Sequence, residues 1–355
     1  MAQAQWHDLG RARSFRKRSL SQLEINGVKI ALSHKKGVFA AVSGECNHVK
    51  GPLGKGRLKG EYIVCPWHGW TFHRTTGRGQ PGYEKACLPR HDVRIKGGRL
   101  LVNLTASNRR THEFHPPHPL ARPVKRAGGP VRVVGISTTP MEKMNPRYST
   151  SEDLLKTALA SAARSGAETR LIRLNELRFS PCGGFYSKDE HACTWPCSYT
   201  QADPKDQMDK VYEALVFWAD AVIVATPIRW GNASSLYYKM AERLNCIENQ
   251  ALVAGDVLIK NKVAAFVITG GQDNVQSVAG QMMTFFGCLG FRFPQFPFIG
   301  TTRGWAAEDM AHNIEFVKRS AALRKEAKDL ARRAVHAART IIGSYNLRGG
   351  RRDGV

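Results

Sequence analysis

Two short groups of cysteine and histidine contain the side chains best suited to holding a metal. Cys46 and His48 form the first group, Cys65 and His68 form the second, and sixteen residues separate His48 from Cys65. Two thiolates and two imidazoles can hold a tetrahedral zinc ion. The same ligands can hold a two-iron cluster, with the thiolates on one iron and the imidazoles on the other. Such a cluster carries one electron at a time, so this second interpretation predicts electron transfer.

The residues around these ligands favour the cluster over zinc. Leu53 stands five residues after His48, and Cys65 opens the run Cys-Pro-Trp-His-Gly-Trp-x-Phe-x4-Gly, which ends at Gly77. From Cys46 to Gly77 the chain resembles the Rieske ferredoxin and oxygenase family. The resemblance implies that Cys46, His48, Cys65 and His68 ligate a 2Fe-2S cluster. It also implies that they lie on two loops at the tip of a small antiparallel β structure, with the histidine-bound iron nearer the surface.

The same resemblance indicates the reduction potential of the cluster. Gly51 and Thr71 stand where respiratory-type Rieske proteins carry two further cysteines joined by a disulfide, and Trp70 and Phe72 line the second loop. Fewer hydrogen bonds to the cluster sulfurs stabilise the reduced cluster less. The potential is therefore expected at the low end of a range from roughly −150 to +300 mV, which suits a redox chain fed by NAD(P)H or flavin.

The first third of the chain is predicted to be an all-β domain over residues 20–104, preceded by a basic segment at 1–19. Short apolar runs bounded by glycine turns predict strands. These strands are expected at residues 28–32, 38–42, 62–64, 93–95 and 100–102. Residues 105–130 are then rich in proline and glycine, which predicts a semi-rigid linker. His112, His115 and His118 recur within it; a polar linker without a site is the main interpretation, and metal binding is the alternative.

The remainder, residues 131–342, is predicted to be a flavodoxin-like, doubly wound α/β domain with a parallel sheet. Strands and helices alternate there, as such sheets require. Strands are expected at 131–136, 168–174, 221–225, 263–268 and 296–299. Helices are expected at 150–165, 206–218, 234–246, 275–289 and 305–342. The glycine- and arginine-rich end, 343–355, is expected to be disordered.

Polar loops follow three of these strands, at the edge where doubly wound sheets bind ligands. The loops resemble those of the flavodoxin-like NADPH-dependent FMN reductase and iron-sulfur flavoprotein family, in which they hold the FMN phosphate, one face of the isoalloxazine and its polar edge. Ser149 and Glu152 also fit a simple capping box, and both interpretations can hold together. The resemblance implies FMN contacts from Ser137, Arg147, Ser149, Thr150, Ser151, Pro227, Ile228, Arg229, Trp230, Gly231, Asn232, Thr269, Gly270, Gly271, Gln272 and Asn274.

The chain departs from that family in its cysteines. Iron-sulfur flavoproteins carry a compact four-cysteine motif, whereas Cys182, Cys193 and Cys197 are widely spaced here and only Cys246 could complete a set. A second metal site, a redox-active pair of Cys193 with Cys197, and ordinary structural thiols all stay open. Without a G-x-G-x-x-G motif after a strand, a separate dinucleotide site is not indicated, so NAD(P)H is expected to bind directly over the flavin.

Composition limits the class of protein. The chain has 355 residues, enough for two domains, and no apolar run long enough to span a bilayer. Eight cysteines are too few for a disulfide scaffold, which favours a reducing, cytoplasmic location. The net charge is +24, and residues 1–130 hold 24 Lys and Arg against 7 Asp and Glu. This charge favours an acidic redox partner, while nucleic-acid binding is not indicated because no reader motif occurs.

Together the two halves predict an oxidoreductase that couples NAD(P)H oxidation, through FMN, to the 2Fe-2S cluster and an external acceptor. A hydride donor supplies two electrons and the cluster accepts one, so FMN is the converter, and no catalytic acid or base is required. One alternative is a cluster-fed flavin reductase of a small organic substrate such as a quinone. Another is a non-catalytic electron-transfer adaptor. An oxygenase is disfavoured because the sequence after residue 131 predicts an α/β sheet and contains no Asp-x2-His-x4-His run. The FMN reductase resemblance implies a homo-oligomer.

Overall fold

The computed structural model describes residues 5–48, 50–81, 84–111, 118–126, 128–142, 144, 146–187, 190–203, 205–270, 274–302 and 307–347. The chain divides into two compact units. Unit 1 comprises Met1–Pro119 with Gly184–Ala192, and unit 2 comprises Leu120–Gly183 with Cys193–Val355. Each unit has its own hydrophobic cores.

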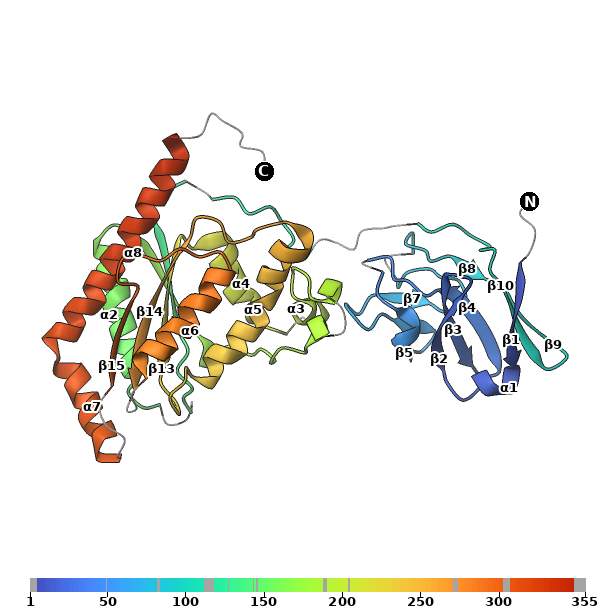
Figure 1. Cartoon of the computed structure of the whole chain (residues 1–355), viewed down its shortest axis with the longest axis horizontal. Coiled ribbons are helices and arrows are strands. Elements are labelled where there is room, and N and C mark those ends of the chain that lie inside the picture. The colour runs from blue at the N-terminus through green and yellow to red at the C-terminus, as the bar shows by residue number, and fades with distance from the viewer. Residues whose placement is uncertain are drawn as a thin grey trace. The chain divides into compact units, whose positions relative to one another are not determined.

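Unit 1 is built from antiparallel strands (Figure 1). One sheet has the order β2-β3-β4-β8, the second β1-β10-β9 and the third β5-β6-β7. The strands are β1 (Trp6–Arg11), β2 (Leu20–Ile25), β3 (Val28–Lys35), β4 (Val38–Ser43), β5 (Arg57–Lys59), β6 (Tyr62–Val64), β7 (Thr71–His73), β8 (Arg90–His91), β9 (Val93–Lys96) and β10 (Arg99–Asn103). Short helices follow β1 at α1 (Ala12–Phe15) and precede β5 at η1 (Leu53–Lys55).

Tight turns set the register of the central hairpins. Asn26 and Gly27, between β2 and β3, both have positive φ, as do Lys36 and Gly37 between β3 and β4. Two consecutive positive φ values give a turn whose twist matches that of the strands it joins. The strands then pair without a slip from Leu20 opposite Ser33 to Ile25 opposite Val28.

The predicted basic segment at 1–19 is not separate from this β structure. β1 pairs with β10 over Trp6–Asn103 to Arg11–Arg99, and Ala12 is buried in the adjoining core. Prediction missed β1 because its sequence, Trp-His-Asp-Leu-Gly-Arg, has no clear alternation of polar and apolar residues. The strand instead forms because β10 offers it an edge to pair with.

Unit 2 has a five-stranded parallel sheet in the order β12-β11-β13-β14-β15. The strands are β11 (Arg132–Ser137), β12 (Glu168–Arg173), β13 (Ala221–Pro227), β14 (Val263–Gly270) and β15 (Phe298–Thr302). This is the flavodoxin-like order, so the predicted α/β class is confirmed. The central strands are buried on both faces because Val133 and Val134 enter opposite cores.

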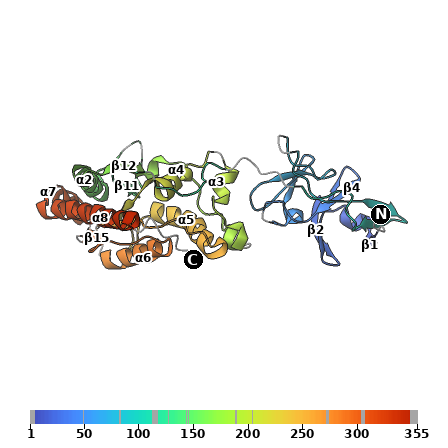
Figure 2. The same ribbon diagram turned by 90° about the horizontal axis from the view of Figure 1, so that it is seen from above.

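Helices cover both faces of this sheet (Figures 1 and 2). α2 (Thr150–Arg164) and α8 (Ala321–Leu347) pack on one face, and α5 (Ser235–Ala254) and α6 (Val275–Cys288) pack on the other. The remaining helices are α3 (Ser198–Ala202), α4 (Met208–Tyr212) and α7 (Ala307–Arg319). α4 continues through Glu213–Trp218 in wider π-helical turns, and short 3-10 turns lie at Leu174–Glu176, Phe185–Ser187 and Glu190–Ala192.

The predicted helix at 305–342 is two helices. It breaks at Ser320, whose hydroxyl accepts a hydrogen bond from the Leu323 backbone N–H and so starts α8. α8 then runs to Leu347, so the predicted disorder from residue 343 is wrong for 343–347. Residues 348–355 lie outside the described residues. None of the described helices is both long enough and apolar enough to cross a membrane.

The predicted linker is also partly packed. Leu120 is only 3% exposed and joins the core of unit 2. Arg126 Nε donates to Asp220 Oδ1 at 2.7 Å, and Arg122 pairs with Glu213 at 2.7 Å. Proline content therefore misled the prediction here, because an extended segment can still bury a side chain in the core that it passes. His112 and His115 lie outside the described residues.

Candidate cofactor sites

The first metal-binding loop of unit 1 follows β4 and holds Cys46 and His48. Backbone hydrogen bonds close it: the Cys46 N–H donates to the Gly51 carbonyl at 2.9 Å, and the Lys50 N–H donates to the Cys46 carbonyl at 3.1 Å. Asn47, between the two ligands, is 8% exposed and donates from Nδ2 to the Thr111 carbonyl at 2.9 Å. The loop is therefore fixed by hydrogen bonds within its own backbone and by the bond from Asn47 to Thr111 in another segment.

The second loop connects β6 to β7 and holds Cys65 and His68. The Cys65 N–H donates to the Trp70 carbonyl at 2.7 Å, and the Gly69 N–H donates to the Cys65 carbonyl at 3.2 Å. Gly69 has a φ of +73°, a conformation that a residue with a side chain adopts only with strain. Trp70 stacks on the His48 ring at 4.8 Å between centroids and an interplanar angle of 6°, so the two loops pack together.

These contacts bring the four predicted ligands together. The rings of His48 and His68 lie 4.5 Å apart between centroids, and both Nδ1 atoms are shielded from solvent. The Cys46 and Cys65 thiols are in hydrogen-bond contact, which lowers the pKa of Cys65 to about 7. Burial, followed by the neighbouring His48, lowers the pKa of His68 to about 3 and so favours the neutral imidazole. Thiolate and neutral imidazole are the forms that bind metal.

Gly51 provides a further test of whether a cluster fits here. A Cβ atom at this position would lie 2.9 Å from Cys65 Sγ, closer than real Cβ atoms approach, and 3.1 Å from the Trp67 ring, which is tighter than most real Cβ contacts. The position next to Cys65 Sγ is thus kept free of any side chain, and even an alanine methyl group would clash there. His48 is half-buried, whereas His68 is only 4% exposed. The donor set and this space together fit a 2Fe-2S cluster.

In unit 2, three predicted flavin-binding loops meet at the carboxyl ends of β11, β13 and β14. Thr150 and Thr269 share a hydrogen bond of 2.7 Å between their hydroxyls, which joins the first loop to the third. Asn274 Nδ2 donates to the Gly231 carbonyl at 2.6 Å, which joins the third to the second. Gly270 permits close approach of these loops because a Cβ atom there would lie 2.8 Å from Ile228 Cβ.

Three hydroxyls form a cluster where α2 begins. Thr139 Oγ1 lies 2.8 Å from Ser149 Oγ and 3.2 Å from Ser151 Oγ, and the two serine hydroxyls are 3.3 Å apart. Ser149 also caps the helix by accepting from the Glu152 N–H. A helix N-terminus and adjacent hydroxyls suit a phosphate group, so this hydroxyl cluster fits the FMN phosphate. Thr139 was not among the predicted contacts, although it is the second residue after the end of β11.

Ser137 and Arg147, two other predicted FMN contacts, lie outside this hydroxyl cluster. Ser137 is 1% exposed and donates to Glu152 Oε2 at 2.9 Å, and Glu152 in turn pairs with Arg173 and Lys156. The Ser137 hydroxyl is therefore used within the fold. Arg147 is exposed on the loop before α2. Gly271 and Gln272, predicted at the polar edge of the flavin, lie outside the described residues.

The loop after β13 presents an exposed aromatic ring. The N–H groups of Arg229 and Asn232 donate to each other's carbonyls at 2.7 and 3.0 Å, closing a tight turn. Trp230 has a φ of +50° at the tip, and its carbonyl accepts from Asn232 Nδ2 at 2.9 Å. The Trp230 side chain is 88% exposed. A ring held in the open beside the flavin loops is placed to contact a planar ligand.

The remaining cysteines of interest lie away from these loops. Cys246 is buried on α5, and Cys193 and Cys197 pack against the same core. The hydrogen bond from Cys246 lowers the pKa of Cys197 to about 5; burial opposes this shift and the positive charge of Arg243 reinforces it. Arg243 and Asp206, each 1% exposed, form a 2.6 Å ion pair beside them. Among the described residues, these cysteines do not form a group of three with any neighbouring His, Cys, Asp or Glu that could hold a metal ion.

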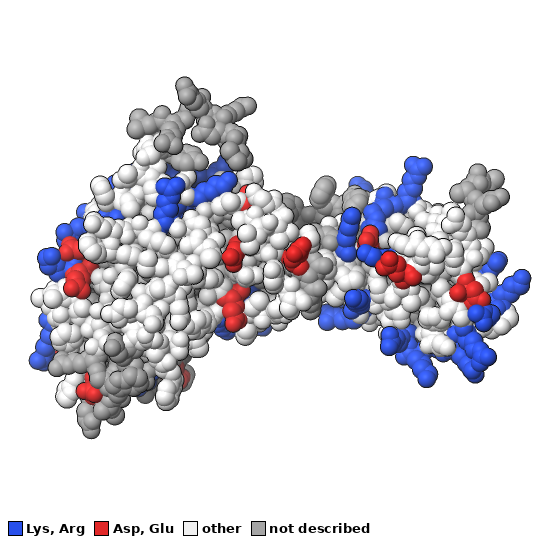
Figure 3. All heavy atoms as spheres, in the orientation of Figure 1, with Lys and Arg blue, Asp and Glu red and all other residues white. Residues whose placement is uncertain are grey.

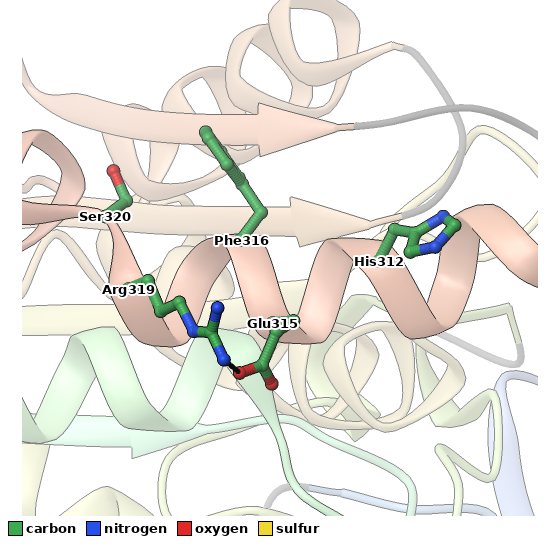
Figure 4. Close-up of a pocket in the computed structure, with 5 residues that line it drawn as sticks. All are labelled: His312, Glu315, Phe316, Arg319 and Ser320. Atoms are coloured by element: carbon green, nitrogen blue, oxygen red, sulfur yellow. Dashed lines mark ion pairs between the residues drawn. The ribbon is translucent and has the colours of Figure 1, made fainter.

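Two hollows lie apart from both sites. Figure 4 shows a shallow pocket along α7, lined by His312, Glu315, Phe316, Arg319 and Ser320, with an ion pair of 2.8 Å between Arg319 and Glu315. A larger cavity of about 1150 Å³ lies at the amino ends of the strands and includes Trp195, Trp218 and Lys262. Lys262 donates there to the Ala219 carbonyl. Neither hollow includes a predicted cofactor contact.

Comparison with known proteins agrees with both sites. Residues 5–91 match the Rieske [2Fe-2S] domain family, and residues 131–301 match the NADPH-dependent FMN reductase family. The chain is 30% identical over 123 residues to the oxygenase component of 3-ketosteroid-9-alpha-monooxygenase from Mycolicibacterium smegmatis, covering 33% of this chain and 30% of that protein. It is 26% identical over 146 residues to an iron-sulfur flavoprotein from Methanocaldococcus jannaschii, covering 41% of this chain and 64% of that protein.

A solved structure shares the fold of the α/β unit. The crystal structure of RosB with a bound intermediate, 8-demethyl-8-formylriboflavin-5'-phosphate, has a TM-score of 0.50 and 19% sequence identity, covering 63% of this chain and 89% of that one. The chain spans less than a third of the length of the curated 3-ketosteroid monooxygenase components.

The chain therefore joins two domain families, a Rieske [2Fe-2S] domain and an NADPH-dependent FMN reductase domain with a flavodoxin-like fold. These families imply a Rieske cluster and FMN as cofactors and NAD(P)H as the electron donor. Each of the two relatives named above covers less than half of this chain.

Proposed function

We propose that the protein is an NAD(P)H-dependent oxidoreductase that passes electrons from FMN through the Rieske cluster to an external acceptor. The observation that carries this proposal is the presence of both cofactor sites in one chain. FMN accepts a hydride and releases electrons singly, and the cluster accepts electrons singly. The protein's part is to hold both groups and set their potentials.

Each proposed site has a defined task for its side chains. Thr139, Ser149 and Ser151 would hold the FMN phosphate, while Trp230 would lie against the isoalloxazine. Cys46, Cys65, His48 and His68 would hold the cluster, and Gly51 leaves it room. Hydride transfer between a nicotinamide and a flavin needs no protein acid or base, so none is assigned.

The proposed acceptor is a protein with an acidic surface. Residues 1–130 hold 24 Lys and Arg against 7 Asp and Glu. Figure 3 shows Lys and Arg side chains spread over unit 1 on the face drawn. Positive charge around an electron-transfer site speeds encounter with a negatively charged partner and makes the rate fall with salt.

Cofactor analysis followed by anaerobic reduction tests this proposal. The purified full chain should contain iron and acid-labile sulfide in equal amounts, together with FMN. NADH or NADPH alone should then bleach both chromophores. Zinc in place of iron, or the lack of flavin, would refute the two-cofactor assignment. If only reduced ferredoxin bleached the chromophores, electrons would enter at the cluster and the alternative flavin reductase would be favoured.

A further inference from the structure

A short segment after β10, here called the 107–111 strap, runs beside the first cluster loop. The Ser107 N–H donates to the Arg90 carbonyl at 2.8 Å, and Thr111 and Cys87 exchange backbone hydrogen bonds of 2.9 and 3.0 Å. Asn108 Nδ2 donates to the Leu88 carbonyl at 2.9 Å. These contacts fix the strap along its length, although it falls in the stretch that composition predicted to be linker.

Arg110 extends from this strap into the cluster loop. Its Nη1 donates to the Glu45 carbonyl at 3.1 Å and to Asn47 Oδ1, and its Nη2 donates to Ser43 Oγ at 2.6 Å. Glu45 and Asn47 are the residues on either side of Cys46. One guanidinium therefore holds the chain immediately before and after a cluster ligand.

The charge of Arg110 also acts on this ligand. The guanidinium is bonded to the residues on both sides of Cys46, so its positive charge is fixed next to this ligand. Arg110 itself is half-buried, so solvent screens its charge less than it would on an open surface. A cluster gains negative charge when it is reduced, so a nearby fixed positive charge stabilises the reduced form.

We propose that Arg110 is a positioning residue for the Rieske cluster, which fixes the Cys46 loop and raises the cluster's reduction potential. This inference rests on the cluster assignment above and adds a specific tuning residue to it. Removing the guanidinium would loosen the loop through the loss of three hydrogen bonds. It would also make the cluster harder to reduce.

The test measures the midpoint potential and iron content of the full-length Arg110→Gln and Arg110→Lys variants. The midpoint potential of the cluster-loaded fraction should fall in Arg110→Gln and fall less in Arg110→Lys, which keeps the charge but not the planar fork. Iron content should fall in both. Arg90→Gln is the matched control, because Arg90 also bonds to the strap, through Ser107 Oγ at 2.9 Å, but makes no such bond to the described residues of the cluster loop.

The potential separates tuning from a merely structural role. Equal midpoint potentials in wild type and Arg110→Gln would overturn the proposal, even if iron content fell. If Arg110→Gln loaded no cluster, the Arg110→Lys variant would decide: a midpoint potential below that of wild type would support the proposal, and an unchanged potential would overturn it. A wild-type protein without a 2Fe-2S spectrum would instead refute the cluster assignment itself.

Discussion

At the residue scale, the cluster site depends on side chains that the sequence identifies and on others that it does not. The four ligands were predicted because thiolate and imidazole donors are visible in the sequence as residue types at a recognisable spacing. Arg110 could not be predicted, since it lies 63 residues from Asn47 and only the fold brings them together. Arginine has many uses, so its type alone indicates no role.

Substitution of Gly51 should affect cluster assembly. In Gly51→Ala the new Cβ atom would lie 2.9 Å from Cys65 Sγ, so the cysteine or the loop must move. We expect a lower iron content in the purified variant, measured by elemental analysis. Gly280→Ala is the control, because nothing lies within 4 Å of a Cβ atom at Gly280 and its iron content should equal that of wild type. Full iron content in Gly51→Ala would contradict this account of the site.

Cys197 should react as a thiolate in mildly acidic solution. Its pKa is lowered to about 5, chiefly by the hydrogen bond from Cys246. Since the thiolate is the reactive form, alkylation should rise through about pH 5 and level off before neutrality. The Cys246→Ala substitution removes the thiol that donates to Cys197, so the alkylation of Cys197 should rise at a higher pH. Pulsed alkylation with mass spectrometry measures both.

Cys193 provides the internal comparison. Burial raises the pKa of its thiol, so its alkylation should still be rising with pH in alkaline solution. If the alkylation of Cys197 rose only in alkaline solution, like that of Cys193, the hydrogen bond from Cys246 would not lower the pKa of Cys197.

At the element scale, strands with strong apolar patterns were predicted well. Strands that form mainly because a neighbouring strand pairs with them were missed, and so was a helix start that depends on one capping residue. β6, β11 and β14 are runs of buried apolar residues. β1 and β7 were missed because their side chains alone do not specify a strand. The break between α7 and α8 was missed because the amphipathic pattern continues through Ser320, where one hydroxyl starts a new helix.

The hydroxyl cluster before α2 should determine FMN affinity. Thr139→Val keeps the side-chain shape and removes the hydroxyl. We expect FMN to bind about tenfold more weakly or worse, since a hydrogen bond to a charged group contributes about 1.5–3 kcal/mol. Thr139→Ser should restore binding. Fluorescence titration of FMN into flavin-free protein measures the affinity.

Ser137 supplies the control for this prediction. Ser137 is the last residue of β11, two residues before Thr139, and its hydroxyl donates to Glu152. Ser137→Ala should therefore alter FMN affinity little. Equal weakening in Ser137→Ala and Thr139→Val would show that the hydroxyl cluster has no special part in binding phosphate.

At the scale of the whole molecule, two domains of different fold class carry two cofactor sites. The sequence predicted both classes, because four ligands mark one and an alternation of strands and helices marks the other. It placed the limits of the units less well. Leu120 and the segment around Arg126 pack on unit 2, and residues 6–11 belong to the β structure of unit 1. The amino-acid composition of a segment indicates its stiffness and polarity, but it does not predict which part of the folded chain the segment packs against.

The central claim is that electrons from NAD(P)H reach the Rieske cluster by way of FMN. Anaerobic stopped-flow mixing of the loaded full chain with NADPH or NADH, followed at wavelengths that separate flavin from cluster, tests it most directly. We predict that flavin absorbance falls first and that cluster absorbance follows within the same turnover. A cluster that bleaches before the flavin, or one that stays oxidised after the flavin is reduced, would contradict the account.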